Sequence, residues 1–518
     1  MLQISHLTLI HKKDLRTLVH DFSVVLNPGD KVAVIGEEGN GKSTLLQWIY
    51  DPKKIEEYCQ WDGKASGNGS IGYLAQQLSE EEKKLSIYEF CSHSTGFAEL
   101  SYKELNDIAR QLAFPVEEYY SERSVGTLSG GEQIKLQLSC LLFGRAEILL
   151  LDEPSSDLDL ETLRWLEEFI NGYHGIVLFI SHDEALIEKT ATAVLHIEHP
   201  NESKTPRSML FRLDYQTYVQ RRNAGIASQT QLAKKEREEH AERMERFRRI
   251  QQSVEHAQKA VSRQDPSKGR LLKKKMHAVV SMGKRFDRYA ENMTQLPEVE
   301  EAIFLRFSPD TIVPAGKIVL DYYCPVLCAG EKELARNVRL RVNGGEKIGI
   351  IGHNGAGKTT LIRLIAEELL NRKDLNASFM PQDYSDCLPM EMTVLDYLAP
   401  SGHKDAISKA STFLGSMRFA REEMFHQIGD LSGGQKAKVF LTQMMLEKSN
   451  VLILDEPTRN FSPLSGPQIR KVLAGYGGSI VSVSHDRKFL SEVCDKIFTL
   501  TPYGLEPIDK ENFFDSIK

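Results

Sequence analysis

The chain has 518 residues, of which 41% are hydrophobic and 26% are charged, a composition typical of soluble globular proteins. Its 65 Lys and Arg against 72 Asp and Glu give a net charge of −7, which for the chain as a whole argues against a nucleic-acid binder. No run approaches the roughly 18 apolar residues of a membrane span, and residues 1–6 lack a signal-peptide pattern, which disfavours membrane and secreted proteins. None of the seven cysteines forms a C-x2-C pair, which disfavours a zinc site and a disulfide scaffold. Together these patterns favour the cytoplasm.

The first predicted elements are a strand and a glycine-rich loop. The apolar run 31–35 predicts a buried strand, and residues 36–43 fit G-x4-G-K-[ST], with a helix opening at 43–46. Glycines let consecutive N–H groups surround phosphate oxygens, Lys42 would reach the β- and γ-phosphates, and the Ser43 hydroxyl would ligate Mg²⁺. The candidate nucleotide-binding residues here are Gly36, Gly39, Asn40, Gly41, Lys42, Ser43 and Thr44.

Two polar segments follow this loop in the chain. Gln76 comes after the strand-like run 71–75, where its side chain could contact Mg²⁺ or the attacking water. The signature segment Leu-Ser-Gly-Gly-Glu-Gln, residues 128–133, is predicted to open a helix and to form a second phosphate cradle. The residues of that cradle are Ser129, Gly130 and Gly131.

Carboxylates and a histidine end the next two apolar runs. Leu149–Leu151 predicts a strand buried in a parallel sheet, and Asp152 at its end is placed to hold Mg²⁺. Glu153 is suited to polarise an attacking water. The β-rich run 176–180 precedes His182, for which we predict contact with the γ-phosphate.

A basic segment occupies the middle of the chain. Residues 220–290 contain 19 Lys and Arg against 8 Asp and Glu, so the rest of the chain carries a net charge of −18. This asymmetry indicates a nucleic-acid partner, although a solvated charged coiled coil acting as a spacer is the alternative. The candidate RNA-binding residues are Arg263, Lys268, Arg270, Lys273, Lys274 and Lys275, where phosphate contacts alone would suffice.

The segment is predicted to be an antiparallel pair of helices. A first helix over about 220–262 would be roughly 64 Å long, with the turn signals Asp-Pro and Gly marking a tip at 263–270. An apolar repeat predicts the seam between the helices. Its residues are Phe247, Ile250, Val254, Ala257, Val261, Leu272, Met276, Val279, Phe286 and Met293, with Gly283 at one seam position.

The same series of motifs then recurs. The signature serine precedes the strand-end aspartate by 23 residues in both copies, and that aspartate precedes the histidine by 30 residues in both. Two such series do not arise by chance, so the repeat unit is a domain of about 200 residues. The second copy assigns Gly352, Asn354, Gly355, Ala356, Gly357, Lys358, Thr359, Thr360, Gln382, Ser432, Gly433 and Gly434 to the nucleotide, Thr359, Gln382 and Asp455 to Mg²⁺, and Glu456 and His485 to catalysis.

These motifs resemble the ATP-binding cassette superfamily. The resemblance implies an α/β fold with two tandem P-loop NTPase domains, joined here by a long antiparallel two-helix linker, that sandwich two ATPs with Mg²⁺ head to tail. The predicted domains are 1–213, with a short arm or helical insert at 78–124, the linker 214–298 with its tip near 262–270, and 299–518. By this resemblance Lys42, Asp152 and Glu153 face Ser432 and Gly434, and Lys358, Asp455 and Glu456 face Ser129 and Gly131.

Two departures from the superfamily pattern follow the strand-end glutamates. The usual Thr-Asn-His-Leu-Asp is Ser-Ser-Asp-Leu-Asp at 155–159 and Thr-Arg-Asn-Phe-Ser at 458–462. The second copy therefore lacks the terminal Asp, which predicts unequal turnover at the two sites. The only ring near residues 10–12 that could stack on adenine is His11.

Tandem cassettes with a helical linker resemble the ABC-F translation factors, and the stretch 455–463 is similar to the Vga/Lsa-type antibiotic-resistance factors. The resemblance implies a monomer with an intramolecular cassette dimer. It would bind the E site of the 70S ribosome with ATP and contact large-subunit rRNA and the P-site tRNA, without binding a membrane or DNA. The implied function is protection from pleuromutilins, lincosamides and streptogramin A.

Three alternatives are weighed against this function. A housekeeping ABC-F factor that regulates elongation or rescues stalled ribosomes would carry the same motifs. An excision-type DNA-repair ATPase also pairs cassettes, but that class carries zinc-binding Cys clusters. The soluble half of a transporter has no reason to carry a basic hairpin of about 70 residues, as residues 220–290 are predicted to form.

Overall fold

The structure is a computed structural model that describes residues 1–67, 69–94, 96–156, 158–199, 205–259, 266–291, 293–294, 307–330, 332–511 and 513. The chain divides into two compact units. Unit 1 comprises Met1–Tyr215 with Glu300–Lys518, and unit 2 comprises Gln216–Val299. Within unit 1 we call residues 1–215 the first cassette and residues 300–518 the second cassette. No helix in the described ranges combines the length and the apolarity that a membrane crossing needs.

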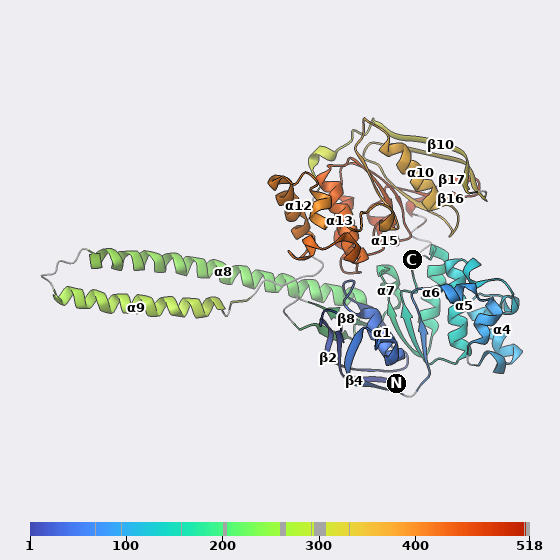
Figure 1. The fold of residues 1–518 in the computed structure, drawn as a ribbon, viewed down its shortest axis with the longest axis horizontal. Helices are drawn as coiled ribbons and strands as arrows, with labels where there is room; N and C mark the ends of the chain where they lie inside the picture. The colour runs from blue at the N-terminus through green and yellow to red at the C-terminus, as the bar shows by residue number, and fades with distance from the viewer. Residues whose placement is uncertain are drawn as a thin grey trace. The chain divides into compact units, whose positions relative to one another are not determined.

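The first cassette is built on a six-stranded sheet of order β5-β6-β7-β3-β8-β9, parallel from β5 to β8 and antiparallel at β9, with a second sheet of order β2-β1-β4. Its strands are β1 (Leu2–His11), β2 (Thr17–Leu26), β3 (Lys31–Ile35), β4 (Cys59–Gly67), β5 (Ile71–Leu74), β6 (Ile148–Asp152), β7 (Ile176–Ile180), β8 (Ala193–Glu198) and β9 (Arg207–Phe211). Its helices are α1 (Lys42–Tyr50), α2 (Glu80–Lys84), α3 (Ile87–Ser92), α4 (Tyr102–Gln111), α5 (Gly130–Phe143), α6 (Leu160–Gly172) and α7 (Glu184–Thr190) (Figure 1).

The second cassette repeats this design. Its six-stranded sheet has the order β13-β14-β15-β12-β16-β17, and β10 pairs with β11 in a separate hairpin. The strands are β10 (Ile318–Ala329), β11 (Lys332–Asn343), β12 (Lys347–Ile351), β13 (Ala377–Met380), β14 (Val451–Asp455), β15 (Ser479–Val483), β16 (Lys496–Thr501) and β17 (Gly504–Ile508). The helices are α10 (Lys358–Leu370), α11 (Val394–Leu398), α12 (Lys404–Ser416), α13 (Gly433–Leu446), α14 (Gly466–Ala474) and α15 (Arg487–Glu492). The predicted α/β class with two tandem cassettes is confirmed.

The burial of the parallel strands explains why their positions could be predicted from apolar runs in the sequence. All residues of β3, β6 and β7 are buried, and β3 and β7 have the bounds predicted from residues 31–35 and 176–180. Strands covered on both faces must be apolar throughout. The helices that cover them begin at the predicted motifs, because α1 and α10 start at the lysines of the glycine-rich loops.

The glycine at the end of β3 has a steric reason to be there. Gly36 has φ +151°, and a Cβ on it would lie 2.3 Å from the carbonyl oxygen of Ile197 on β8. Only glycine lets the loop turn this close to the neighbouring strand. The same turn delivers Lys42 to the start of α1.

Residues 78–124 form helices that belong to the first cassette. Helix α4 packs against α5, and the hydroxyl of buried Tyr119 lies 2.8 Å from Oγ of Ser139 on α5. The segment thereby supports the helix that follows the signature segment.

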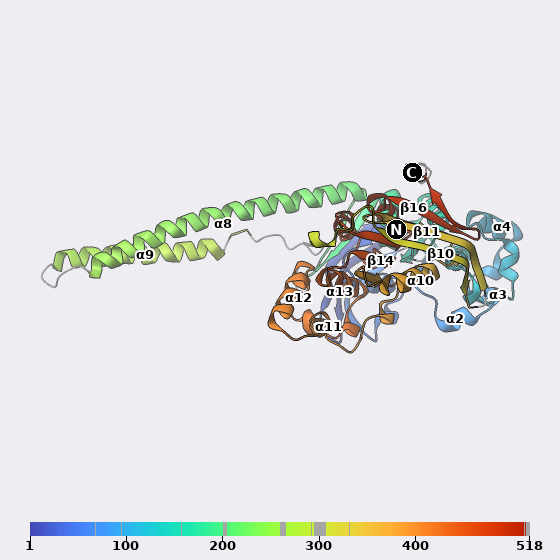
Figure 2. The same ribbon diagram turned by 90° about the horizontal axis from the view of Figure 1, so that it is seen from above.

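Unit 2 contains α8 (Tyr215–Lys259, which begins at the last residue of unit 1's first part) and α9 (Pro266–Glu291), which lie side by side in Figures 1 and 2. The rings of Phe247 and Phe286 meet edge to face at 5.6 Å, and a Cβ on Gly283 would lie 3.2 Å from the Phe247 ring. These three residues were predicted at the seam.

Several details of the predicted helix pair are wrong. Ile250 is 46% exposed, because a residue three positions from Phe247 is rotated by about 60° from the line of contact in a helix of 3.6 residues per turn. Helix α9 starts at Pro266, since proline suits the first helical position, so residues 266–270 are helical rather than part of a turn. Met293 lies beyond the end of α9.

Candidate functional site

The first glycine-rich loop closes around its lysine. Lys42 lies at the start of α1 and is 8% exposed, and its Nζ donates to the carbonyl oxygens of Gly36 and Glu37, each at 2.9 Å. Burial lowers the pKa of Lys42, while nearby carboxylates, first Glu37 and then Glu153, oppose that shift. The ammonium of Lys42 thus lies inside the loop, where it can pair with an anion, but the carboxylates around it would compete with that anion.

Two of the predicted Mg²⁺ ligands meet at the end of β6. The hydroxyl of Ser43 donates to Oδ1 of Asp152 at 3.0 Å, and the hydroxyl of Tyr73 donates to Oδ2 at 3.1 Å. Burial raises the pKa of Asp152 to about 6. Tyr73 was not identified in the sequence analysis. It lies on β5, three residues before Gln76, and so at the same edge of the sheet as Asp152.

Glu153 is the centre of a hydrogen-bonded cluster. Its carboxylate accepts from Nε2 of Gln76 and from Oγ of Ser156, each at 3.0 Å, and its Oε1 lies 3.1 Å from Nε2 of His182. Burial disfavours the charged form, but the hydrogen bond and charge of His182 prevail and lower the pKa of Glu153 to about 2. The left-handed backbone of Glu153, φ +52°, aims this side chain toward the cluster.

His182 has acceptors on both sides of its ring. Its Nδ1 lies 2.7 Å from the carbonyl oxygen of Phe461 in the second cassette, and its Nε2 faces Glu153. Burial lowers the pKa of His182, yet the bond to Glu153 outweighs burial and raises it. Because an imidazolium donates through both nitrogens, acceptors on both sides of the ring favour the charged form of His182 beside an ionised Glu153.

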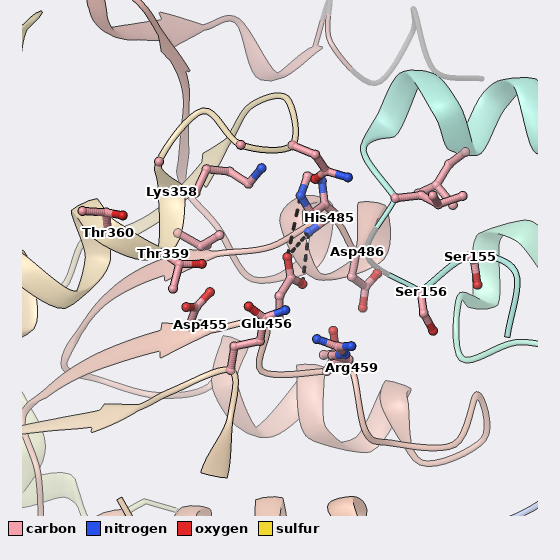
Figure 3. Close-up of a pocket in the computed structure, with 18 of the residues that line it drawn as sticks. Ser155, Ser156, Lys358, Thr359, Thr360, Asp455, Glu456, Arg459, His485 and Asp486 are labelled. Carbon is pink, nitrogen blue, oxygen red and sulfur yellow. Dashed lines mark hydrogen bonds and ion pairs between the residues drawn. The ribbon is translucent and has the colours of Figure 1, made fainter. Parts of the chain in front are cut away.

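The second site has the same groups in a different arrangement. Nζ of Lys358 donates to the carbonyl oxygens of Gly352 at 2.8 Å and His353 at 2.9 Å. Both carboxylate oxygens of Asp455 are buried without a hydrogen-bond partner within the described ranges, and burial raises its pKa to about 6. Figure 3 shows the side chain of Asp455 beside Thr359. Unpaired carboxylate oxygens next to a hydroxyl fit a hard cation such as Mg²⁺.

Glu456 is held by backbone and hydroxyl donors. Its carboxylate accepts from the backbone N–H of His485 at 3.1 Å and from Oγ of Ser484 at 3.3 Å, whereas Nε2 of the His485 ring is 4.0 Å away. Burial raises the pKa of Glu456 to about 8 and lowers the pKa of His485 to about 3. The pKa is therefore lowered at Glu153 and raised at Glu456, because the two carboxylates have different donors. Unequal turnover at the two sites stays a prediction.

A cavity of about 480 Å³ lies at the second site (Figure 3). From the second cassette it is lined by the glycine-rich loop, the strand-end carboxylates, Gln382 and His485, and from the first cassette by Ser155, Ser156, Leu158, Leu163, His182 and Asp183. The predicted approach of Ser129 and Gly131 to this site is not seen in that lining. A Cβ on Gly131 would lie 2.9 Å from Oγ1 of Thr162, so Gly131 is buried against α6 of its own cassette, whereas Ser129 is exposed.

At the first site the signature segment does reach the opposite loop. The backbone N–H of Gly434 donates to Oε2 of Glu38 at 2.5 Å. Ser432 caps α13, because its Oγ accepts from the N–H of Gln435 at 3.2 Å. The loop of Lys42 therefore contacts Gly434 through Glu38. That Lys42, Asp152 and Glu153 face Ser432 stays a prediction. Glu37 and Glu38 were not identified in the sequence analysis, although two acidic residues inside a phosphate-binding loop are visible in the sequence and would compete with the phosphates.

His11, considered for adenine stacking, lies 6.5 Å ring to ring from Tyr58, and its Nδ1 lies 2.7 Å from Oδ1 of Asp14. Its stacking on adenine stays a prediction. Of the candidate RNA-binding residues, Arg270 and the lysines at 273–275 are exposed on α9. Arg263 and the side chain of Lys268 fall outside the described residues.

Comparison with protein families matches residues 19–156 and 335–459, together just over half of the chain, to the family described as ABC transporter. The chain is similar to the ribosome protection protein VmlR of Bacillus subtilis (strain 168), with 27% identity over 503 residues that cover 95% of this chain and 85% of that protein. It is similar to the tylosin resistance ATP-binding protein TlrC of Streptomyces fradiae, with 26% identity over 92% of this chain and 93% of that protein.

The probable ATP-binding protein YheS of Escherichia coli (strain K12) is 24% identical over 96% of this chain and 78% of its own length. Among solved structures, an archaeal ribosome recycling factor in complex with the stalk protein aP1 has a TM-score of 0.60 at 15% identity, covering 99% of this chain and 92% of that chain. The RNase-L inhibitor has a TM-score of 0.58 at 16% identity, covering 99% and 93%. These two likenesses show the fold.

Proposed function

We propose that this chain, which belongs to the ABC transporter family and is an ATPase, uses ATP binding and hydrolysis to associate with the bacterial ribosome and leave it, as an ABC-F factor. The reaction releases ADP and phosphate. One observation carries the proposal: a single chain contains two cassettes and a basic helical segment. This chain is also similar along its length to a ribosome protection protein.

Each cassette offers a complete set of groups for the reaction. Lys42 and Lys358 would bind the β- and γ-phosphates, and the pairs Ser43–Asp152 and Thr359–Asp455 would hold Mg²⁺, which neutralises phosphate charge when bound. In the first site Glu153, fixed by its donors Gln76 and His182, would orient the attacking water. The roles of the site residues are part of this proposal.

Nucleotide can control the pairing of the cassettes because it contacts both. The γ-phosphate would lie between the loop of one cassette and the signature segment of the other, so it stabilises the closed pair more than the open pair. Hydrolysis removes that differential contact and lets the cassettes separate. Binding of the ribosome in the ATP state and release after hydrolysis follow from this cycle.

The basic segment supports an RNA partner. Helix α9 exposes Arg270 and the lysines at 273–275, and these charges belong to the segment 220–290 with its excess of Lys and Arg. Clustered cations repel one another unless a polyanion neutralises them, and ribosomal RNA is such a polyanion. Because phosphate contacts dominate this kind of binding, the interaction should weaken steeply with salt.

Within this function we propose ribosome protection against drugs of the peptidyl-transferase centre. The factor would occupy the E site, shift the P-site tRNA and bring the tip near 262–270 to the drug site, so that pleuromutilins, lincosamides or streptogramin A leave. Support comes from the similarity to the proteins named for ribosome protection and for tylosin resistance. The Vga/Lsa type is part of the same proposal.

Cell-free translation tests this function. Bacterial ribosomes are inhibited with a pleuromutilin, and purified chain is added with ATP. We expect translation to recover, and the Lys42→Ala, Lys358→Ala variant, which lacks both phosphate-binding lysines, should give no recovery. Equal inhibition with and without the wild-type chain, repeated for a lincosamide and streptogramin A, would contradict drug protection.

A housekeeping ABC-F factor is the second candidate, since the chain is also similar over 96% of its length to YheS, which is named for ATP binding and not for drug resistance. Drug susceptibility of a host with and without the gene separates the two. An unchanged minimum inhibitory concentration, together with an effect on elongation or on stalled ribosomes, would favour the housekeeping function.

A further inference from the structure

The phosphate-binding loop of the first cassette contains two adjacent glutamates, Glu37 and Glu38, and both contact the second cassette. We propose that these carboxylates form an internal anion that occupies the signature segment of the second cassette when no nucleotide is bound. ATP closes the first site only by displacing them, so the first site binds ATP more weakly than its other groups would allow. The inference rests on ATP binding at both sites and is independent of the ribosome.

Glu38 lies where the cradle should hold a phosphate oxygen. Its Oε2 accepts from the N–H of Gly434 at 2.5 Å, and a Cβ on Gly433 would lie 3.3 Å from Oε1. Both glycines are in the first turn of α13, which has 14 residues and is capped by Ser432. Free N–H groups and the positive end of a helix dipole stabilise an anion, and a carboxylate satisfies them as a phosphate would.

Glu37 accepts hydrogen bonds from two hydroxyl groups of the second cassette. Its Oε1 accepts from Oγ of Ser462 at 2.8 Å and from Oγ of Ser465 at 2.6 Å. Both serines are buried, with exposed fractions of 2% and 0%. Short hydrogen bonds to a charged acceptor are about twice as strong as neutral ones, so this contact holds the loop to the second cassette.

At the second site the corresponding contact has the acidic group on the other side, because the loop residue is a histidine and its partner is an aspartate. His353 follows the first glycine of its loop as Glu37 does, and Asp159 follows its strand-end glutamate by six residues, as Ser462 follows Glu456. Nδ1 of His353 lies 3.4 Å from Oδ2 of Asp159. An aspartate at position 462 would face Glu37 and repel it, whereas a serine donates to it. The acidic loop and its hydroxyl partners are therefore a matched pair.

The consequence is a difference between the two sites. At the first site the carboxylates beside Lys42 compete with the triphosphate for its ammonium and for the cradle at Gly434. At the second site the loop Gly-His-Asn-Gly-Ala-Gly, residues 352–357, has no acid, and a cavity lies over Lys358. ATP should fill the second site first, with closure of the first site as the later step.

Hydrogen exchange of the full-length chain without nucleotide tests the contact. We expect the amides of residues 433–435 to exchange about tenfold faster in Glu38→Ala than in the wild type, because the variant lacks the carboxylate that protects Gly434. Glu81→Gln, which changes an exposed glutamate on α2, should leave their exchange unchanged. Equal exchange rates in Glu38→Ala and in the wild type would overturn the proposal.

Nucleotide binding tests the competition. In a Lys358→Ala background, which disables the second site, the Kd of the first site is measured with the Mg²⁺ complex of a non-hydrolysable ATP analogue. Glu38→Gln removes the charge at constant size, and we expect its Kd to be about tenfold lower, the factor that one charge-assisted hydrogen bond supplies. An unchanged or higher Kd would overturn the proposal. Ribosomes are absent from both assays, so ribosome binding can fail while this inference holds.

Discussion

A buried ion network joins the two cassettes, and replacing Arg470 on α14 is the most direct way to test it. The Arg470 guanidinium donates to Glu184 on α7 of the first cassette at 2.7 Å and to Glu492 at 2.9 Å. The side chains of Arg470 and Glu184 are only 4% and 10% exposed. Replacing Arg470 by Met keeps the volume but leaves Glu184 with Lys488, 3.1 Å away, as its remaining cation.

The expected loss follows from desolvation. Removing one partner of a buried ion pair costs about 3–5 kcal/mol, because the other charge stays buried. Lys488 offsets part of this, so we expect a loss near the lower end, about 3 kcal/mol. With a urea m-value of 2–3 kcal/mol/M, that loss would lower the unfolding midpoint by about 1 M.

Tryptophan fluorescence can locate this loss. The three tryptophans, Trp48, Trp61 and Trp165, all lie in the first cassette, whereas Arg470 lies in the second. Urea unfolding followed by tryptophan emission therefore reports the first cassette alone. If the network stabilises the first cassette across the interface, Arg470→Met should lower the midpoint of this signal by about 1 M.

The control is Lys471→Met, which removes an exposed cation from the neighbouring position of α14 and should leave the midpoint unchanged. If Arg470→Met and Lys471→Met gave the same tryptophan midpoint as the wild type, the pairing of Arg470 with Glu184 would not stabilise the first cassette. The reasoning from the buried network would then be refuted.

Three further changes have defined outcomes. Replacing the exposed lysines 273–275 by Gln should reduce the slope of log K against log salt for ribosome binding by about 2–3, since each phosphate contact contributes roughly 0.7–0.9. Tyr73→Phe removes a hydroxyl that donates to Asp152, and we expect the Mg²⁺ concentration for half-maximal ATPase activity to rise about tenfold. Gly36→Ala places a Cβ 2.3 Å from the Ile197 carbonyl oxygen and should lower the free energy of unfolding by several kcal/mol, measured by thermal denaturation.

Each change has a matched control. Lys404→Gln with Lys409→Gln alters exposed lysines of α12 and should leave the salt slope as it is. Tyr50→Phe alters the ring stacked on Tyr73 at 5.4 Å and should not change the Mg²⁺ requirement. Gly172→Ala has no atom within 4 Å of the added Cβ and should not destabilise the protein. Equal effects of a change and its control would contradict the corresponding argument.

Local patterns predicted the elements that position the site. The strand at 31–35 and the helices that start after Ser129 and Ser432 were readable, because burial on both faces and helix capping are properties of neighbouring residues. Ser43 and Asp152, both predicted to hold Mg²⁺, do lie within hydrogen-bond distance, since parallel strands bring their carboxyl ends to one edge of the sheet.

Contacts between distant segments were not readable in this way. Glu37 and Ser462 are 425 residues apart, and neither local sequence indicates that the two side chains are in contact. The covering of Gly131 by Thr162 depends on how α6 packs, which the motif spacing does not encode. Ile250 was misplaced because a period of 3 and 4 fits both the seam and a line rotated away from it.

Ribosome binding with and without nucleotide is the decisive measurement. If Glu153 and Glu456 have the proposed role, the Glu153→Gln, Glu456→Gln protein should bind ATP without orienting the attacking water, so ATP should trap its cassettes in the closed state. In sucrose gradients with 70S ribosomes we predict cosedimentation when Mg²⁺ and ATP are present and migration with free protein when they are omitted. Equal cosedimentation without nucleotide, or migration with free protein in its presence, would contradict a nucleotide-controlled ribosome factor.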